Sequence, residues 1–332
     1  YVFKSMDRGD HWKVISPNLT RSSKPEKKSF SMGYIAESPL QKGYLYAGTD
    51  RGAFWISKDD GLTWEEKDNG IAHNYIRSIY PSRFSPTRIY ITMTGLNYDD
   101  LHSYAYVSEN NGDNWTNITS NLPDEPIHVL IEDLKYENIL YLGSIRGVYI
   151  STDTGRSWSY LGNPMPGTAI ADLEINKNRN ELIAATHGRG MYKLNLHPIH
   201  QMISNKVSPE NDYLLPIKEV GLPWFSSSSN LPDYRTVEKI SFSFWLANAK
   251  QISLAIKDKN NTEVWKTNVV GKKGLNEYRW DMILKRQDSD LPYFTKYKTY
   301  IHAGEYNLEL SDGTTAMKTG FKIKNREKPY KE

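Results

Sequence analysis

The sequence predicts an all-β fold, a partial β-propeller followed by a second β-domain, and three observations lead to this prediction. An eight-residue box recurs four times, runs of alternating apolar and polar residues separate the copies, and aromatic residues are abundant, with 23 Tyr, 9 Trp and 9 Phe among 332 residues. Aromatic side chains favour half-buried strand surfaces. The length allows one large all-β domain with an accessory module.

The box has the pattern Ser-x-Asp-x-Gly-x-x-Trp, and its copies begin 52, 51 and 43 residues apart. Such spacings match the roughly 40 to 50 residues of one propeller blade. In each copy we expect a hairpin between the third and fourth strands of a blade. The structural box residues are Ser5, Asp7, Gly9, Trp12, Ser57, Asp59, Gly61, Trp64, Ser108, Asn110, Gly112, Trp115, Ser151, Asp153, Gly155 and Trp158.

The box residues suit a turn that satisfies its own polar groups. The Ser and Asp side chains can accept backbone N–H bonds, the Gly supplies a positive φ, and the Trp packs under the loop. In the third copy, Asn110 occupies the Asp position. Because Asn cannot act as a carboxylate base, the sequence favours a structural role for the box.

The same order of strands recurs around the boxes. The fourth unit reads IHVLIED, ILYLGS, GVYIS, box and SWSYLG, whereas a fifth unit, TAIADLEIN, ELIAATH and GMYKLNL, has no box and ends near residue 196. This alternation predicts strands. We count two strands in the first unit, four in each of the next three and three in the last, about 17 in all.

The strand count predicts an incomplete ring, because propellers close with about 4 to 8 blades of four strands each. The first unit lacks its inner strands and the last lacks its outer strand. We therefore expect residues 1–196 to be the C-terminal part of a larger propeller. The remaining blades would be a partner supplied by missing sequence or by another chain.

The boxes and the turns GTDRG, GSIRG and THGRG resemble the Asp-box, or bacterial neuraminidase repeat, propellers. That group includes sialidases, xyloglucanases and sortilin-type sorting receptors. The chain looks most like the sortilin-related propeller proteins of Bacteroidetes-type bacteria. The resemblance covers residues 1 to about 196, and it implies a propeller fold and a secreted or cell-envelope location, in the periplasm or at the outer surface. Members include enzymes and receptors, so activity stays open.

A linker and a β-sandwich are expected after the blades. Residues 197–235 are rich in Pro and Ser without sustained periodicity, which predicts a linker. Residues 236–326 carry the patterns of six or seven short strands, which favour a β-sandwich. Two of its segments, GLNEYRWDM and AGEYNLELSDG, resemble an Ig-like module of the flagellar hook-cap type, whose usual roles are spacing, docking or partner contact. We expect Trp265 and Trp280 to be core residues.

Composition excludes several classes of function. The net charge is +3, and the 42 basic and 39 acidic residues are spread along the chain, which argues against a nucleic-acid partner. The chain has no Cys and no apolar run of 18 residues, so we expect no thiolate chemistry and no membrane span. No P-loop, GxGxxG or HExxH motif occurs, and we expect no cofactor and no metal.

The candidate site lies in the turns between second and third strands, at the blade end opposite the boxes. The binding candidates are Asp50, Arg51, His102, Arg146, His187 and Arg189, and weaker catalytic candidates are Tyr98, Asp99 and Asp100. Arginines at equivalent turns could hold a carboxylate. Tyr98 and Asp99 could serve as nucleophile and acid, or two carboxylates could flank a sugar bond.

Two functions remain open from the sequence. The first is a non-enzymatic binding or scaffold protein of the cell envelope or exterior, whose propeller engages a protein, a peptide or a glycan. The second is a glycoside hydrolase of sialidase or xyloglucanase type. Paired carboxylates roughly 5 to 10 Å apart in a cleft would favour hydrolysis. A face occupied by another polypeptide would favour binding.

Overall fold

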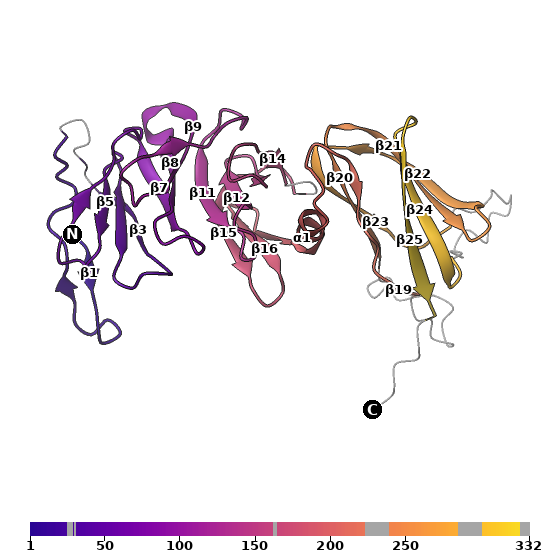
Figure 1. The fold of residues 1–332 in the computed structure, drawn as a ribbon, viewed down its shortest axis with the longest axis horizontal. Coiled ribbons are helices and arrows are strands. Elements are labelled where there is room, and N and C mark those ends of the chain that lie inside the picture. Colours follow the sequence, from indigo (N-terminus) through magenta and orange to yellow (C-terminus); the bar gives the residue numbers. More distant parts are fainter. Residues whose placement is uncertain (25–28, 30, 162–164, 223–238, 285–300, 326–332) are drawn as a thin grey trace. The chain divides into compact units, whose positions relative to one another are not determined.

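The computed structural model describes residues 1–24, 29, 31–161, 165–222, 239–284 and 301–325. The chain divides into two compact units, Tyr1–Leu196 and His197–Glu332 (Figure 1). Each unit has its own sheets and its own hydrophobic core.

The first unit is a series of antiparallel sheets that follow one another along the chain (Figure 1). Their strands are β1 (Phe3–Lys4) and β2 (Lys13–Val14); β3 (Met32–Glu37), β4 (Leu45–Thr49), β5 (Phe54–Ser57) and β6 (Glu65–Glu66); β7 (Tyr75–Pro81), β8 (Ile89–Gly95), β9 (Asp100–Ser108) and β10 (Thr116–Asn117); β11 (Ile127–Glu132), β12 (Leu140–Ser144), β13 (Val148–Ser151) and β14 (Ser159–Tyr160); and β15 (Ile170–Asn176), β16 (Glu181–Thr186) and β17 (Met191–Asn195). A short 3₁₀ helix, η2 (Leu96–Tyr98), precedes β9. The predicted grouping of two, four, four, four and three strands is confirmed.

The hydrophobic cores of this unit lie between successive sheets. The second strands β4, β8 and β12 are buried along their whole length. Tyr46 and Phe54 of one sheet share a buried cluster with Ile76 of the next. Tyr90 similarly joins Leu140 in a cluster between the third and fourth sheets. Sheets that pack face to face in chain order are the arrangement of propeller blades.

The first strand of each of the last four sheets carries a β-bulge at the same place. The register shifts at Gly33, Arg77, His128 and Ala171. A bulge bends its strand and re-aims the extra residue. At Gly33 the bend brings the backbone so close to the next sheet that a Cβ atom would lie 2.6 Å from the carbonyl oxygen of Ile76.

The second unit is a β-sandwich of two sheets. Its elements are α1 (His197–Ser204), β18 (Tyr213–Leu214), β19 (Val220–Gly221), β20 (Ile240–Leu246), β21 (Lys250–Asp258), β22 (Glu263–Gly271), β23 (Gly274–Trp280), β24 (Gly304–Ser311) and β25 (Ala316–Lys324). One sheet has the order β18-β20-β23 and the other β19-β25-β24-β21-β22. Trp265 and Trp280, with ring centroids 5.0 Å apart, belong to the core that both sheets share, as predicted.

The segment 197–235, predicted to be a linker, contains α1, β18 and β19 in its described part. β18 pairs with β20, and β19 pairs in parallel with β25. The indole N–H of Trp245 also donates to the carbonyl of Pro209 at 2.9 Å. Strands of two residues are too short to show a period of two in the sequence, which is why the pattern missed them.

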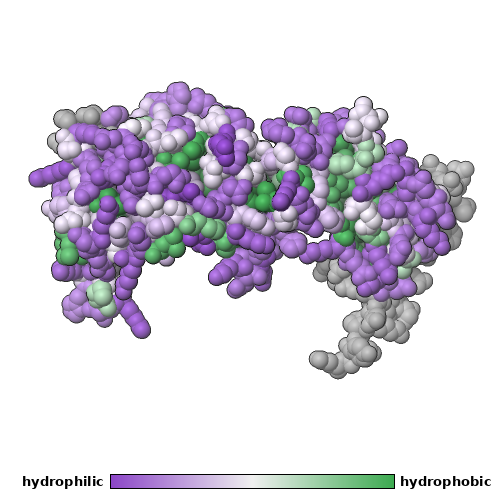
Figure 2. All heavy atoms as spheres, viewed as in Figure 1, coloured by the Kyte–Doolittle hydropathy of each residue, from purple (hydrophilic) through white to green (hydrophobic). Residues whose placement is uncertain are grey.

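The chain is therefore all-β in class, with propeller-type blades followed by a β-sandwich. Among the described residues, no helix has the length and apolar character needed to cross a membrane. Most of the visible surface is hydrophilic, with smaller hydrophobic areas between (Figure 2).

Candidate functional site

The four boxes form hairpins that satisfy their own polar groups. In the fourth copy, the Ser151 hydroxyl accepts the N–H of Gly155 at 2.8 Å and donates to Asp153 at 2.8 Å, and Asp153 accepts the N–H of Ser157 at 2.9 Å. In the third copy, Asn110 accepts the N–H of Asn114 at 2.9 Å. The Asp position of the box therefore requires a hydrogen-bond acceptor, but it does not require a negative charge.

The box Trp also links neighbouring sheets. Its indole N–H donates to a backbone carbonyl of the preceding sheet, from Trp64 to Ile15 at 2.9 Å, from Trp115 to Lys67 at 2.8 Å and from Trp158 to Ile118 at 2.7 Å. Each acceptor is the residue that follows an outer strand. The box is therefore a contact between blades as well as a turn.

The candidate site residues lie in the turns at the opposite end of the blades, between second and third strands. Asp50 and Arg51 join β4 to β5, Tyr98 and Asp99 precede β9, Arg146 joins β12 to β13, and His187 and Arg189 join β16 to β17. Asp100 and His102 are the first and third residues of β9. We call this end the turn face.

Arg51 and Tyr98 meet across two neighbouring sheets on the turn face. The guanidinium carbon of Arg51 lies 4.6 Å from the centre of the Tyr98 ring, within cation–π range. The Tyr98 hydroxyl donates to the carbonyl of Asp50 at 3.3 Å. Asp99, between η2 and β9, has a φ of 57°. These contacts place Tyr98 against the preceding turn.

Asp100 is the centre of a hydrogen-bond cluster. It accepts the Nδ2 group of Asn74 and the hydroxyl of Tyr104, both at 2.8 Å, and it contacts Nδ1 of His102 at 2.7 Å. Partial burial alone would raise the pKa of Asp100, but bonds from His102, Tyr104 and Asn74 outweigh it and hold that pKa well below its ordinary value. Asp100 is thus an ionised acceptor at neutral pH.

His102 lies between two carboxylates, Asp100 on β9 and Asp124 in the loop that precedes the next sheet. Its Nε2 is 3.5 Å from Asp124, in the loop before β11. The hydrogen bond to Asp100 and the charge of Asp124 raise the pKa of His102 above its ordinary value. The ring is exposed, so it can respond to pH and to ligands.

Arg146 is held by a buried carboxylate. Glu125 is only 3% exposed and accepts the hydroxyls of Ser144 at 2.5 Å and Tyr149 at 3.0 Å through Oε1. Its Oε2 faces Nε of Arg146 at 3.4 Å. A buried carboxylate needs a compensating cation. The Arg146 side chain is nevertheless 73% exposed, so its terminal nitrogens can reach a ligand.

His187 and Arg189 lie in a Gly-rich turn of the last sheet. The N–H of His187 donates to the carbonyl of Ala169 at 2.8 Å, and that of Arg189 donates to the hydroxyl of Thr186 at 3.2 Å. Gly188 and Gly190 both have positive φ, of 85° and 75°. These bonds shape the turn and leave the Arg189 side chain at its tip.

The structure adds site residues that sequence reasoning missed. Asn74, Asp124 and Glu125 come from the loops between one blade and the next, on the same face as the turns. The run NLPDEPIH contains two of them, and its acidic residues next to a strand were the available signal. Across blades two to four, the contacts form the series Arg51–Tyr98, Asp100–His102–Asp124 and Glu125–Arg146.

Polar side chains also occur on the inner first strands. Burial, with the charge of Asp172 on β15, raises the pKa of Tyr34 on β3, and Arg77 on β7 lies close enough to oppose that shift. His128 on β11 contacts the carbonyl of Ile170 at 2.8 Å. Burial lowers the pKa of His128 below its ordinary value.

Among the described residues, no three His, Cys, Asp or Glu side chains are placed to hold a metal ion.

Comparison with known proteins found similarity among solved structures. No family model and no curated protein matches the chain. An ancestral GH74 enzyme is 15% identical with a TM-score of 0.47, the GH74 xyloglucanase from Xanthomonas campestris is 11% identical with a TM-score of 0.47, and YCF48 bound to D1 peptide is 12% identical with a TM-score of 0.35.

These matches cover unequal shares of the chains compared. The two GH74 structures match 95% of this chain but only 41% and 47% of their own length, and YCF48 matches 64% of this chain over 69% of its own. The chain thus spans less than half of either GH74 protein. At these identities the likeness concerns the fold alone.

Proposed function

We propose that this chain is a non-enzymatic binding or scaffold protein of the cell envelope or exterior, and that its turn face engages an acidic group of a protein, a peptide or a glycan. The binding residues are those of the turn face, Asp50, Arg51, His102, Arg146, His187 and Arg189, together with their partners Asp124 and Glu125. The second unit, Ig-like by sequence resemblance, serves as a spacer or docking module.

The observation that carries this proposal is the position of Arg146. Its Nε faces Glu125, which restricts the guanidinium, while the side chain is 73% exposed. The planar fork of an exposed guanidinium matches the two oxygens of a carboxylate or phosphate. Less side-chain entropy is lost on binding when an arginine is already oriented.

Arg51 adds a second oriented cation to the same face. It lies over the Tyr98 ring, 4.6 Å from the ring centre, so a contact with an aromatic ring orients it. Its positive charge is therefore not neutralised by that contact. His102, whose raised pKa favours the protonated form, adds positive charge below neutral pH.

The bonding of the catalytic candidates argues against hydrolysis. A glycosidase acid needs a raised pKa, whereas the pKa of Asp100 lies below its ordinary value. Asp100 also accepts bonds from Asn74, Tyr104 and His102, and the Tyr98 hydroxyl donates to Asp50. These groups are engaged in holding the loops together.

Binding can be tested on an array of acidic and neutral peptides and of sialylated, uronic-acid and neutral oligosaccharides. We expect acidic probes to bind selectively. A charge-assisted hydrogen bond contributes about 1.5 to 3 kcal/mol, so Arg146→Ala should weaken the best probe about 10- to 100-fold in calorimetric titration. Arg156→Ala is the matched control, since Arg156 is an exposed arginine in the box of the same blade.

The proposal would be contradicted if Arg146→Ala and Arg156→Ala reduced affinity equally. It would also be contradicted if neutral probes bound as tightly as acidic ones. Release of sugar from xyloglucan or a sialoside by the wild-type chain would establish the hydrolase alternative instead. That activity should then disappear in Asp100→Asn.

A further inference from the structure

An Asn or Asp residue is followed by Gly at four places in the chain, and the structure holds these Asx-Gly pairs differently. The pairs are Asp60-Gly61, Asn69-Gly70, Asn111-Gly112 and Asp312-Gly313. At such a pair the backbone nitrogen of the Gly can attack the side-chain carbonyl carbon, because Gly has no Cβ atom to hinder the approach. The attacking nitrogen must first lose its proton, so a hydrogen bond donated by that N–H opposes the reaction.

In three of the four pairs, a serine hydroxyl accepts the Gly N–H. The distances are 2.8 Å from Gly61 to Ser57, 2.8 Å from Gly112 to Ser108 and 3.1 Å from Gly313 to Ser311. The first two bonds belong to the box hairpins. The box therefore protects the Asx-Gly pair that it contains.

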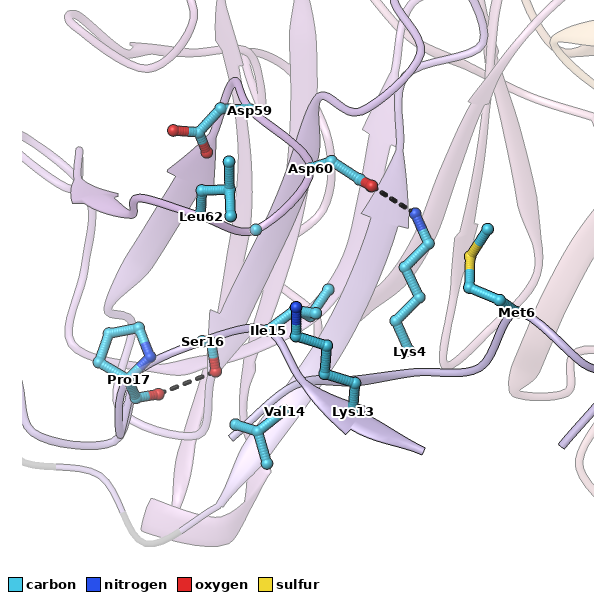
Figure 3. A pocket seen from close by; sticks show the side chains of 11 residues that line it. Lys4, Met6, Lys13, Val14, Ile15, Ser16, Pro17, Asp59, Asp60 and Leu62 are labelled. Carbon is cyan, nitrogen blue, oxygen red and sulfur yellow. Dashed lines mark hydrogen bonds and ion pairs between the residues drawn. The ribbon is translucent and has the colours of Figure 1, made fainter. Parts of the chain in front are cut away.

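Packing also restricts the pairs in the boxes. A Cβ atom on Gly61 would lie only 2.6 Å from the carbonyl oxygen of Ile15. Figure 3 shows the carboxylate of Asp60 in contact with Lys4, at 2.5 and 2.6 Å. Gly112 is buried in the third box. These contacts restrict the movement that would bring the Gly nitrogen to the side-chain carbon.

The pair Asn69-Gly70 lies in the loop between β6 and β7 and has no such protection. Among the described residues, no group accepts the N–H of Gly70. Both residues are exposed, and a Cβ atom on Gly70 would meet nothing within 4 Å beyond its chain neighbours. Gly70 has a φ of 90°, which Gly adopts without steric cost. The loop thus has room for the attack.

Lys24 places a cation at the carbonyl group that would be attacked. Its Nζ donates to Oδ1 of Asn69 at 3.0 Å and also pairs with the buried carboxylate of Asp68. The attack puts negative charge on Oδ1 of Asn69, and an ammonium group at hydrogen-bond distance stabilises such charge. In the third box, by contrast, Oδ1 of Asn111 is buried and has no hydrogen-bond donor among the described residues.

We propose that Asn69-Gly70 is a site of spontaneous deamidation in the folded protein, whereas Asn111-Gly112 is protected. Hydroxide removes the amide proton of Gly70, and the nitrogen then bonds to Cγ of Asn69. The Cγ–Nδ2 bond breaks, and Nδ2 leaves as ammonia after taking a proton from water. Water opens the resulting succinimide at either of its two carbonyl carbons, which gives an aspartyl or an isoaspartyl residue.

The product changes the loop that leads to the turn face. Exchange of NH₂ for OH creates a carboxylate within reach of Lys24, and the isoaspartyl form also adds a methylene group to the backbone. The same loop ends at Asn74, which donates to Asp100 at 2.8 Å. Deamidation itself requires no ligand on the turn face, so either proposal can fail alone.

Incubation of the full chain at mildly alkaline pH tests the proposal. Brief digestion at acidic pH stops the reaction, and mass spectrometry of the peptides then measures the exchange of NH₂ for OH at each Asn. In the folded protein, position 69 should react about tenfold faster than position 111, because the hydrogen bond of Gly112 raises the barrier there. In urea, both positions should react at similar rates. Asn69→Gln should remove the fast reaction, and Asn111→Gln should leave it unchanged.

Lys24→Met tests the contribution of the cation. It should slow the reaction at position 69 several-fold in the folded protein and leave the rate in urea unchanged, and circular dichroism checks that the variant is folded. Equal rates at positions 69 and 111 in the folded wild-type protein would overturn the proposal. A rate at position 69 that Lys24→Met leaves unchanged or increases would overturn the role of Lys24.

Discussion

At the scale of single residues, the box position held by Asp7, Asp59 and Asp153 is defined by hydrogen-bond geometry. Asn110 and Asp153 each accept the N–H of the residue four positions later, at the same 2.9 Å. The natural replacement of Asp by Asn at one of the four copies shows that the charge is dispensable. Asp100 differs, because its three side-chain partners stabilise the ionised form.

His102 leads to a prediction about pH. Its folded-state pKa is raised above the ordinary 6.5 by Asp100 and Asp124. Its contribution to stability is therefore fully present below the unfolded pKa and is lost as the pH rises through the folded pKa. His102→Gln should lower the free energy of unfolding near pH 5.5 and have a smaller effect near pH 9. Urea unfolding at several pH values measures this difference.

Asp124→Asn provides the control for His102. It removes one of the two carboxylates, so the pH dependence of the His102→Gln effect should shrink in this background. Asn74 and Tyr104 also contact Asp100, but Asn74 does not titrate, and burial with Asp100 raises the pKa of Tyr104 to about 12, outside the range tested. An effect of His102→Gln that is equal at both pH values would contradict the assignment.

At the scale of elements, successive blades are joined by the box Trp. Trp158 is 3% exposed and donates to Ile118 in the preceding blade, whereas Trp12 is 63% exposed. The same motif thus makes a buried contact in one copy and an exposed one in another. The difference follows from the neighbour and not from the local sequence.

Trp158→Phe and Trp12→Phe should therefore have different effects. Trp158→Phe removes a buried hydrogen bond and leaves a small cavity, which should lower the free energy of unfolding by about 1 to 3 kcal/mol. Trp12→Phe should change it by less than about 0.5 kcal/mol, as for other surface substitutions. Calorimetry of the full chain measures the free energy of unfolding of both variants. Equal changes in this free energy would show that the contact between blades adds no stability.

At the scale of the whole molecule, the chain consists of two units with separate cores. The second compact unit comprises His197–Glu332, and β18 and β19 each belong to one of its two sheets. Asp212 contributes as well, since it pairs with Lys250 at 2.5 Å and accepts the N–H of Ala247 at 2.9 Å.

Two fragments test where the second unit begins. Residues 197–332 should fold cooperatively, because the core cluster of this unit contains only residues from that range. Residues 236–332 should unfold at lower urea concentration or aggregate, since removal of β18 and β19 exposes the edges of β20 and β25. Circular dichroism and urea unfolding decide the matter, and equal midpoints would place the boundary at residue 236.

Much of the architecture was predictable from the sequence because it depends on local patterns. The spacing of the box repeat predicted the number of blades, and the alternation of apolar residues predicted the strands. Together they predicted the groups of strands that the structure contains. Of the candidate site, the turn residues could be placed on one face, but their partners could not. Asn74, Asp124 and Glu125 approach the turns only because adjacent blades pack together.

The sequence alone determined the all-β class, the repeat, and the turn that carries each candidate arginine, since hairpins and periodicity are local properties of the backbone. Only the tertiary structure decided which side chains contact each candidate arginine and how exposed each arginine is. Glu125 restrains Arg146, and Tyr98 supports Arg51. These outcomes depend on contacts between residues far apart in the chain, and the packing of separate blades sets such contacts.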